Sequence, residues 1–202
     1  MYRLYDYLPS GNGYKVRLLL RWLGVPYELV ELDILRKETR TAEFLAKNPN
    51  GRIPLLEFPD GRRLAESNAI LFHLSEGTPY LPSDPWERAQ VMHWLFWEQY
   101  SHEPCIATVR HWVIHVPPDT PEKRWLLEQK RTQGEAALRM MEEHLRGRQW
   151  FVGAGITIAD IALYAYTHVA HEGGFDLSPY PALRAWLARV AARPGTVPIT
   201  AG

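Results

Sequence analysis

The spacing of apolar side chains divides the chain into two parts of different character. In the first 76 residues, short runs rich in aromatic and branched apolar residues alternate with segments whose apolar side chains recur at helical spacing. The short runs predict strands at 1–7, 26–33, 53–58 and 62–65. The periodic segments predict helices at 14–23, 38–47 and 67–76. The predicted order is therefore βαβαββα, with a parallel first strand pair and an antiparallel hairpin at Asp60-Gly61 in the same sheet.

The second part begins with a proline-rich segment and then shows only helical patterns. Three prolines fall within residues 78–85, which is typical of a semi-rigid linker. Thr157 and Asp160 have the spacing of a capping box at a helix start. The predicted helices cover residues 86–115, 121–145, 157–171 and 181–192. We therefore expect an α/β domain over 1–77, a linker over 78–86 and an all-α domain over 87–202.

Charge and composition narrow the classes of protein. The 23 basic and 23 acidic residues balance, so the chain lacks the basic excess that is typical of nucleic-acid binders. Apolar residues make up 46% of the chain, which excludes a disordered protein, yet no apolar run is long enough to span a membrane. Cys105 is the single cysteine, so no disulfide framework forms within the chain, and we expect a protein of the reducing cytoplasm.

Three places in the first part carry candidate chemistry. Ser10 lies in the loop between a strand and a helix start, where free amides and the helix dipole favour an anion. Pro54 opens a strand, where a cis peptide bond would fit. Glu66 and Ser67 begin another helix, and their carboxylate, hydroxyl and amide together suit a zwitterionic amino-acid head group. Each place also has a simpler explanation, as a turn, a strand entry or a helix cap.

The histidines do not predict a metal site. His111 and His115 share a helix face, as do His168 and His171, but neither pair has the third ligand and neighbouring carboxylate of a zinc motif. Hydrogen-bonded or solvated histidines explain the pattern.

Taken in order, these motifs resemble those of cytosolic glutathione transferases of the bacterial, serine-type group. The resemblance covers essentially the whole chain and rests on five stretches: LPSGNGYKVRLLL, NPNGRIPLL, AESNAI, GAGITIADIAL and PYPALRAWLARVAARPG. It implies a thioredoxin-like domain that binds glutathione as co-substrate, followed by an all-helical domain that contributes the electrophile site. It also implies a homodimer, and from the charge, hydropathy and histidine patterns we expect no nucleic-acid, membrane or metal partner.

The resemblance further implies which residue acts on the glutathione sulfur. Ser10 matches the catalytic serine and would hydrogen-bond the sulfur. Many relatives carry Pro or Cys where this chain has Asn12 and Gly13, so Asn12 could share or replace that role. Tyr5 or Tyr7 is a further alternative, because tyrosine-type classes use a residue in this region.

The remaining glutathione contacts are implied in the same way. Glu66 and Ser67 would hold the γ-glutamyl ammonium and carboxylate, and the backbone of Ile53 would pair with the cysteinyl residue. Arg52, and less directly Lys37 or Thr39, would meet the glycyl carboxylate. The full set of implied glutathione-binding residues is Lys37, Thr39, Arg52, Ile53, Pro54, Glu66 and Ser67. The hydrophobic electrophile would contact Tyr7, Trp97, Tyr100 and Trp112.

The expected activity is therefore activation of the glutathione thiolate for attack on hydrophobic electrophiles. Two alternatives remain open. One is a glutathione-dependent disulfide reductase or peroxidase that uses the same thiol site. The other is a non-catalytic protein that binds glutathione or a partner on the same fold.

Overall fold

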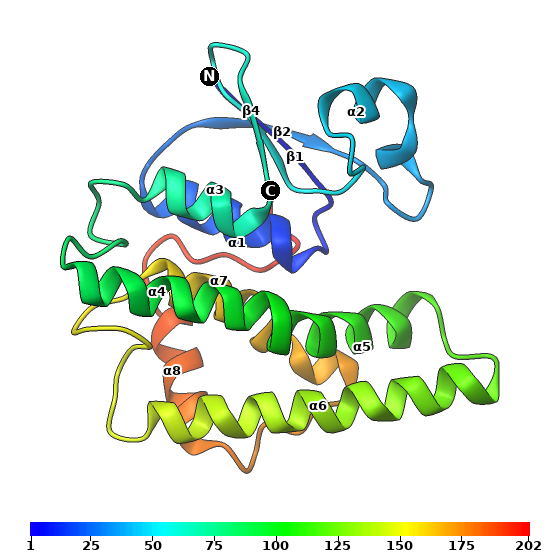
Figure 1. Ribbon diagram of the computed structural model, residues 1–202, viewed down its shortest axis with the longest axis vertical. Helices are drawn as coiled ribbons and strands as arrows, with labels where there is room; N and C mark the ends of the chain where they lie inside the picture. Colours follow the sequence, from blue (N-terminus) through cyan, green and yellow to red (C-terminus); the bar gives the residue numbers. More distant parts are fainter. The chain divides into compact units, whose positions relative to one another are not determined.

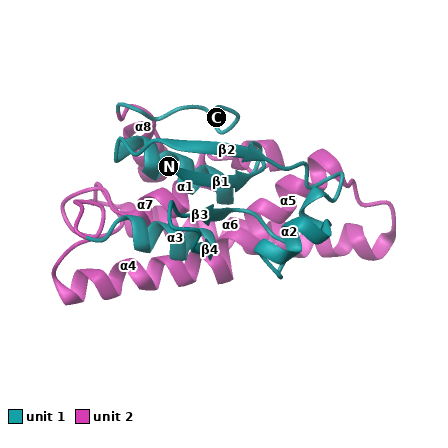
Figure 2. Ribbon diagram, turned by 90° about the horizontal axis from the view of Figure 1, so that it is seen from above, with its two compact units in different colours: residues 1–76, 194–202 teal, residues 77–193 magenta.

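The computed structural model describes residues 1–202, which form two compact units. Unit 1 comprises residues 1–76 together with 194–202, and unit 2 comprises residues 77–193 (Figure 2). The sequence analysis placed residues 194–202 in the all-helical domain, whereas these residues belong to unit 1.

Unit 1 contains a four-stranded sheet with the order β2-β1-β3-β4. The strands are β1 (Tyr2–Asp6), β2 (Tyr27–Glu31), β3 (Leu55–Glu57) and β4 (Arg63–Ala65). β1 pairs with β2 in parallel, and β3 is antiparallel to both β1 and β4. The predicted mixed sheet, with its parallel pair and added hairpin, is confirmed.

Helices cover both faces of this sheet because buried side chains alternate along its strands. Leu4 and Leu56 face α1 (Gly11–Trp22) and α3 (Ser67–Leu74), whereas Tyr5 and Leu55 face α2 (Ala42–Lys47) on the other side (Figure 1). A 3-10 turn, η1 (Glu38–Arg40), precedes α2. The first face is filled by Leu4, Val16, Leu20, Leu56 and Ile70, and the second by Tyr5, Phe44 and Leu55.

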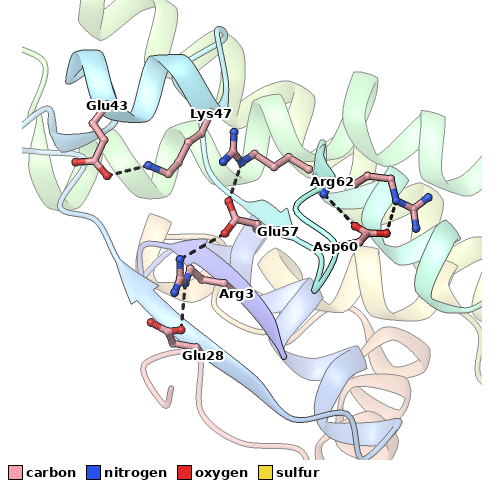
Figure 3. A network of polar contacts seen from close by, with 8 residues as sticks. Arg3, Glu28, Glu43, Lys47, Glu57, Asp60 and Arg62 are labelled. Carbon is pink, nitrogen blue, oxygen red and sulfur yellow. Dashed lines mark hydrogen bonds and ion pairs between the residues drawn. The ribbon is translucent and has the colours of Figure 1, made fainter.

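Charged side chains cross the sheet as a ladder (Figure 3). Arg3 Nε donates to Glu28 Oε2 at 3.1 Å, and Arg3 Nη1 donates to Glu57 Oε1 at 3.4 Å. Arg63 Nε donates to Glu57 Oε2 at 2.7 Å. Cross-strand pairs of this kind contribute at most about 1 kcal/mol each to stability. The ladder therefore supports a strand register that the buried side chains already select.

Residues 194–202 are held on unit 1 by a buried arginine. Arg17 and Asp6 are fully buried, and Arg17 Nε donates to Asp6 Oδ2 at 2.8 Å. Arg17 Nη2 donates to the carbonyls of Leu8, at 2.7 Å, and Ile199, at 2.9 Å. A buried guanidinium must find acceptors for its five N–H groups, and the carbonyls of Ile199 and Ala201 in this terminal segment supply part of them. Burial nevertheless raises the pKa of Asp6 to about 6, although Arg17 opposes that rise.

Unit 2 is all-helical, as predicted. Its helices are α4 (Pro85–Trp97), α5 (Glu103–His115), α6 (Pro121–Leu145), α7 (Ile158–Thr167) and α8 (Pro181–Ala191), with a 3-10 turn, η3 (Ala170–Gly173), before α8. In Figure 1, α6 runs alongside α5. None of the helices is both long enough and apolar enough to cross a membrane.

The predicted helix over residues 86–115 is interrupted. A π-helical turn, η2 (Glu98–His102), separates α4 from α5, and the amide of Glu103 donates to the carbonyl of Glu98. Pro104 explains the interruption, because proline has no N–H for the helical ladder and its ring crowds the carbonyl four residues earlier. In the segment before α4, Tyr80 and Leu81 are buried and the Tyr80 carbonyl accepts from Ile158 N at 2.9 Å.

The predicted capping box at α7 is present. Thr157 N donates to Asp160 Oδ2 at 2.8 Å, and the Thr157 side chain accepts in return from the first turn. Asp160 also accepts from Phe151 N at 3.1 Å and from Trp186 Nε1 at 2.9 Å, so one fully buried carboxylate joins three segments of unit 2. Burial raises the pKa of Asp160 to about 6.

Candidate functional site

Most of the predicted binding residues lie at one end of the sheet of unit 1. β1 and β2 run in parallel and both end there. β3 begins at the same end, because Leu55 pairs with Tyr5 of β1 and with Ala65 of β4. Strand register alone therefore gathers the loop after β1, the Ile53-Pro54 bond and the connection from β4 to α3.

Ser10 is the residue immediately before α1. Its amide donates to the carbonyl of Tyr7 at 2.7 Å, and its carbonyl accepts from Tyr14 N at 3.0 Å. Its side chain makes no capping hydrogen bond, so capping does not explain the hydroxyl. The first-turn amides of α1 and the positive end of the helix dipole lie beside it. This arrangement favours an anion near the half-buried Ser10 hydroxyl.

The structure brings Asn12 and Ser67 together through a lysine that the sequence analysis missed. Lys15 is fully buried, and its Nζ donates to Asn12 Oδ1 at 2.9 Å and to Ser67 Oγ at 3.3 Å. Ser67 Oγ also donates to Asn12 Oδ1 at 3.3 Å. The available signal in the sequence was a lysine beside Val16, inside the run of residues that α1 buries. A charged side chain within such a run requires polar partners from elsewhere in the fold.

Glu66 and Ser67 differ locally from the prediction. Ser67 is the first residue of α3, and Glu66 occupies the cap position without a side-chain capping bond. Glu66 has φ 68° and ψ 111°, and Lys37 is the other non-glycine residue with positive φ, at 61°. Such backbone strain in a residue with a Cβ is held by its surroundings and is frequent at ligand sites. Glu66 itself is exposed, so its carboxylate can meet a ligand from solution.

The Ile53-Pro54 peptide bond is cis, as the sequence suggested. The segment before it is held by Asn48, whose Nδ2 donates to the Arg52 carbonyl at 2.7 Å. Arg52 and Lys37 are exposed, whereas Thr39 is buried. Of these residues, Arg52 and Lys37 therefore present a positive charge to a ligand that approaches from solution.

The two candidate tyrosines, Tyr5 and Tyr7, lie in different surroundings. Tyr5 is buried in the sheet core, with its ring centroid 5.9 Å from that of Phe44. Tyr7 is half-buried in the loop that leads to Ser10. Of the two, only Tyr7 therefore lies in that loop.

The aromatic residues predicted to contact the electrophile do not all share one cavity in unit 2. Trp97 and Tyr100 line a hollow of about 460 Å³ together with Cys105 and Met140. Tyr100 is 87% exposed, whereas Trp97 is half-buried. Trp112 is also half-buried but does not line this hollow.

Cys105 itself is buried, and its Sγ donates to Gln133 Oε1 at 3.5 Å. Burial raises the pKa of its thiol, which opposes thiolate formation.

No group of three His, Cys, Asp or Glu side chains lies close enough together to hold a metal ion. The His111 and His115 rings are 5.2 Å apart, and burial is the main reason that the pKa of His111 is lowered.

Comparison with known proteins gives consistent matches over both units. The glutathione S-transferase N-terminal domain matches residues 1–76, and the C-terminal domain of the same family matches residues 104–194. The crystal structure of a glutathione S-transferase from Pseudomonas fluorescens has 50% sequence identity and a TM-score of 0.94, covering 98% of each chain.

More distant relatives are also similar over most of their length. The disulfide-bond oxidoreductase YfcG of Escherichia coli is 30% identical over 197 residues, which are 94% of this chain and 90% of that protein. A glutathione transferase homologue from Lodderomyces elongisporus, solved with two glutathione molecules per subunit, has 25% identity and a TM-score of 0.87. That match covers 96% of this chain and 94% of the homologue.

Proposed function

Because this chain belongs to the glutathione S-transferase family, we propose that it is a glutathione transferase, which activates the thiolate for attack on hydrophobic electrophiles. The observation that carries the proposal is the convergence at one sheet end of an anion-favouring helix start with Ser10, Asn12 and Ser67. This arrangement offers separate groups for the sulfur and for the amino-acid end of glutathione.

The proposed binding mode follows from the charges of the tripeptide. The Glu66 carboxylate pairs with the γ-glutamyl ammonium, and the amide of Ser67, at the start of α3, donates to the γ-glutamyl carboxylate. The backbone of Ile53, ahead of Pro54, pairs with the cysteinyl residue. The glycyl carboxylate meets Arg52, with Lys37 and Thr39 as the further candidates.

Thiolate stabilisation is the central chemical step. A free thiol has a pKa of about 8.5, so little of it is ionised at neutral pH. Lowering the pKa by about two units requires about 2.7 kcal/mol of preferential stabilisation of the thiolate. One hydrogen bond to a charged group contributes about 1.5–3 kcal/mol, so a donor from Ser10 or Asn12, aided by first-turn amides of α1, suffices.

The activated sulfur then forms a bond to an electrophilic carbon as the leaving group departs with its electron pair. We assign the binding of the apolar part of the electrophile to Tyr7, Trp97, Tyr100 and Trp112, because aromatic side chains favour flat apolar molecules. We also propose a cytoplasmic homodimer, as expected from the family.

A disulfide reductase is the second candidate, favoured by the similarity to the Escherichia coli oxidoreductase. In that reaction the glutathione thiolate attacks a disulfide sulfur and one thiolate departs. A second glutathione then displaces the remaining thiol, giving oxidised glutathione.

The test compares Ser10→Ala and Asn12→Ala with the wild type in two assays, conjugation of an aryl halide and reduction of a small disulfide. Ser83→Ala, at an exposed serine in unit 2, is the matched control. The variant that removes the sulfur donor should raise the pKa of the bound thiol by about one unit and lower kcat/KM about tenfold below neutral pH. Wild-type protein that neither binds immobilised glutathione nor turns over either substrate would overturn the proposal.

A further inference from the structure

Arg17 connects two parts of unit 1 that the proposed function leaves separate. One is the loop over residues 7–10, the Ser10 loop, and the other is residues 194–202, the terminal segment. Arg17 Nη2 donates to the Leu8 carbonyl of the loop at 2.7 Å and to the Ile199 carbonyl of the terminal segment at 2.9 Å. A single guanidinium nitrogen therefore bonds both segments.

The Ser10 loop is held at its start by the same buried ion pair. The Tyr7 amide donates to Asp6 Oδ1 at 2.7 Å, and Asp6 Oδ2 accepts from Arg17 Nε at 2.8 Å. The Ser10 amide then donates to the Tyr7 carbonyl at 2.7 Å and closes the turn. The position of the Ser10 hydroxyl thus depends on how firmly the Asp6 and Arg17 side chains are held.

The terminal segment is held along one face of α1. Arg17 Nη1 donates to the Ala201 carbonyl, and Arg21 donates to the carbonyl of the next residue. Tyr14 Oη donates to the Val197 carbonyl at 2.6 Å. Positions three and four apart on a helix are neighbours, so residues 14, 17 and 21 form one continuous seat for the segment.

We propose that Arg17 is a positioning residue that orients the Ser10 loop for the glutathione sulfur, and that the terminal segment holds Arg17 in place. The inference rests on the proposed function, since it takes the sulfur as the atom that the Ser10 loop meets. Arg17 is fully buried and acts on the ligand only through the loop.

The donors of the guanidinium explain why the terminal segment matters. Arg17 has five N–H donors, and each one that is buried without an acceptor is costly. Asp6 and Leu8 accept from two of these donors. Ile199 and Ala201, in the terminal segment, accept from two more. If the segment left its seat, the guanidinium would turn toward water to satisfy these two donors, and its bond to the loop would weaken.

A coupling of this kind is reciprocal. If the terminal segment favours glutathione binding by orienting the Ser10 loop, bound glutathione must favour the seated segment by the same factor. The Ala201 amide donates to the Pro198 carbonyl at 2.9 Å, so its hydrogen exchange reports on the seated segment. We expect glutathione to slow this exchange, although the proposed binding mode places no part of the ligand on the terminal segment.

The test loosens the terminal segment and leaves Arg17 unchanged. Ile199 is 6% exposed, and Ile199→Ala removes most of its buried side chain. We expect faster deuterium uptake at the Tyr7 and Ser10 amides. The pKa of the bound thiol, followed by ultraviolet absorbance, should rise by about half a unit, with kcat/KM about threefold lower at pH 6 to 7 and equal to the wild type above pH 9. The matched control is Ile156→Ala, at an isoleucine of unit 2 that is 8% exposed, and it should change none of these values.

A double variant shows whether the terminal segment acts through Arg17. Arg17→Lys keeps the charge beside Asp6 but replaces the planar fork with a single nitrogen. Adding Ile199→Ala to Arg17→Lys should then cause no further rise in thiol pKa. A full additional rise, or an unchanged thiol pKa in Ile199→Ala, would overturn the inference. Should Arg17→Lys fail to fold, the wild type decides, because Ala201 exchange that does not slow with bound glutathione contradicts the coupling.

The failure of this inference can be told apart from the failure of the proposed function. Wild-type protein that binds no glutathione overturns the proposed function. The uptake at the Ser10 loop in Ile199→Ala, measured without ligand, still tests whether Arg17 couples the two segments. Uptake equal to that of the wild type would show that it does not.

Discussion

Gly13→Ala provides a sharp test of the packing beneath Ser10 and Asn12, at the start of α1. An alanine Cβ at this position would lie 1.6 Å from Asp6 Oδ1 and 2.1 Å from Asp6 Oδ2, far inside contact distance. Asp6 has no free space in which to move, because it is fully buried and accepts from Arg17 Nε at 2.8 Å. The substitution must therefore displace either the Asp6 carboxylate or the start of α1.

The size of the effect follows from what that displacement breaks. Disrupting a buried ion pair costs about 3–5 kcal/mol, because it leaves a charge without its partner. Replacing a helical glycine with alanine returns about 1 kcal/mol of helix propensity. The expected net loss in the free energy of unfolding is therefore about 2–4 kcal/mol. For a chain of this size, that loss lowers the melting temperature by about 4–16 °C.

The measurement is urea and thermal unfolding followed by circular dichroism, with Gly155→Ala as control. No atom lies within 4 Å of a Cβ added at Gly155, so this variant should unfold within about 0.5 kcal/mol of the wild type. Glutathione-dependent activity of Gly13→Ala should fall as well, because Arg17 also binds the carbonyl of Leu8 in the loop before Ser10. A loss below about 1 kcal/mol would refute the reasoning, since it would mean that Asp6 is not held in place.

Two further predictions concern unit 2. Burial raises the pKa of Asp160 from 3.8 to about 6, so between these values the folded state binds more protons than the unfolded state. The contribution of this carboxyl to the free energy of unfolding should therefore be complete below pH 4 and fall by about 3 kcal/mol as pH rises through 6. The difference in unfolding free energy between wild type and the non-titrating Asp160→Asn should shrink accordingly; a difference that grows with pH would contradict this. Gly134→Ala in α6 should lower stability by about 1 kcal/mol in urea unfolding, because its Cβ would lie 2.6 Å from the Phe175 ring and overpacking outweighs the gain in helix propensity. Stability equal to or above wild type would show that the ring yields easily.

The local features of the fold were the most predictable ones. The Asp60-Gly61 turn and the capping box of Thr157 and Asp160 rest on interactions between residues a few positions apart. Because these interactions lie within short segments, they do not depend on how the rest of the chain folds. The sequence allowed a cis bond before Pro54, because cis peptide bonds occur almost only before proline, but it left an ordinary strand entry equally open.

Where the prediction failed, a single residue or a distant contact was responsible. The helix over residues 86–115 divides at η2 because Pro104 removes an N–H from an otherwise unbroken helical pattern. Residues 194–202 belong to unit 1 because their carbonyls satisfy Arg17, about 180 positions earlier in the chain. The helical spacing of apolar residues alone predicts neither the division of this helix nor the placement of residues 194–202.

The sequence by itself determined the order of strands and helices, the mixed sheet and the motifs of the proposed glutathione site. Only the tertiary structure decided that Lys15 lies between Asn12 and Ser67, residues that are 55 positions apart. The physical reason is that periodic apolar patterns specify which faces are buried, whereas a buried charge can be placed only by the acceptors that other segments bring to it. In this protein such acceptors are supplied by α3 for Lys15 and by residues 194–202 for Arg17.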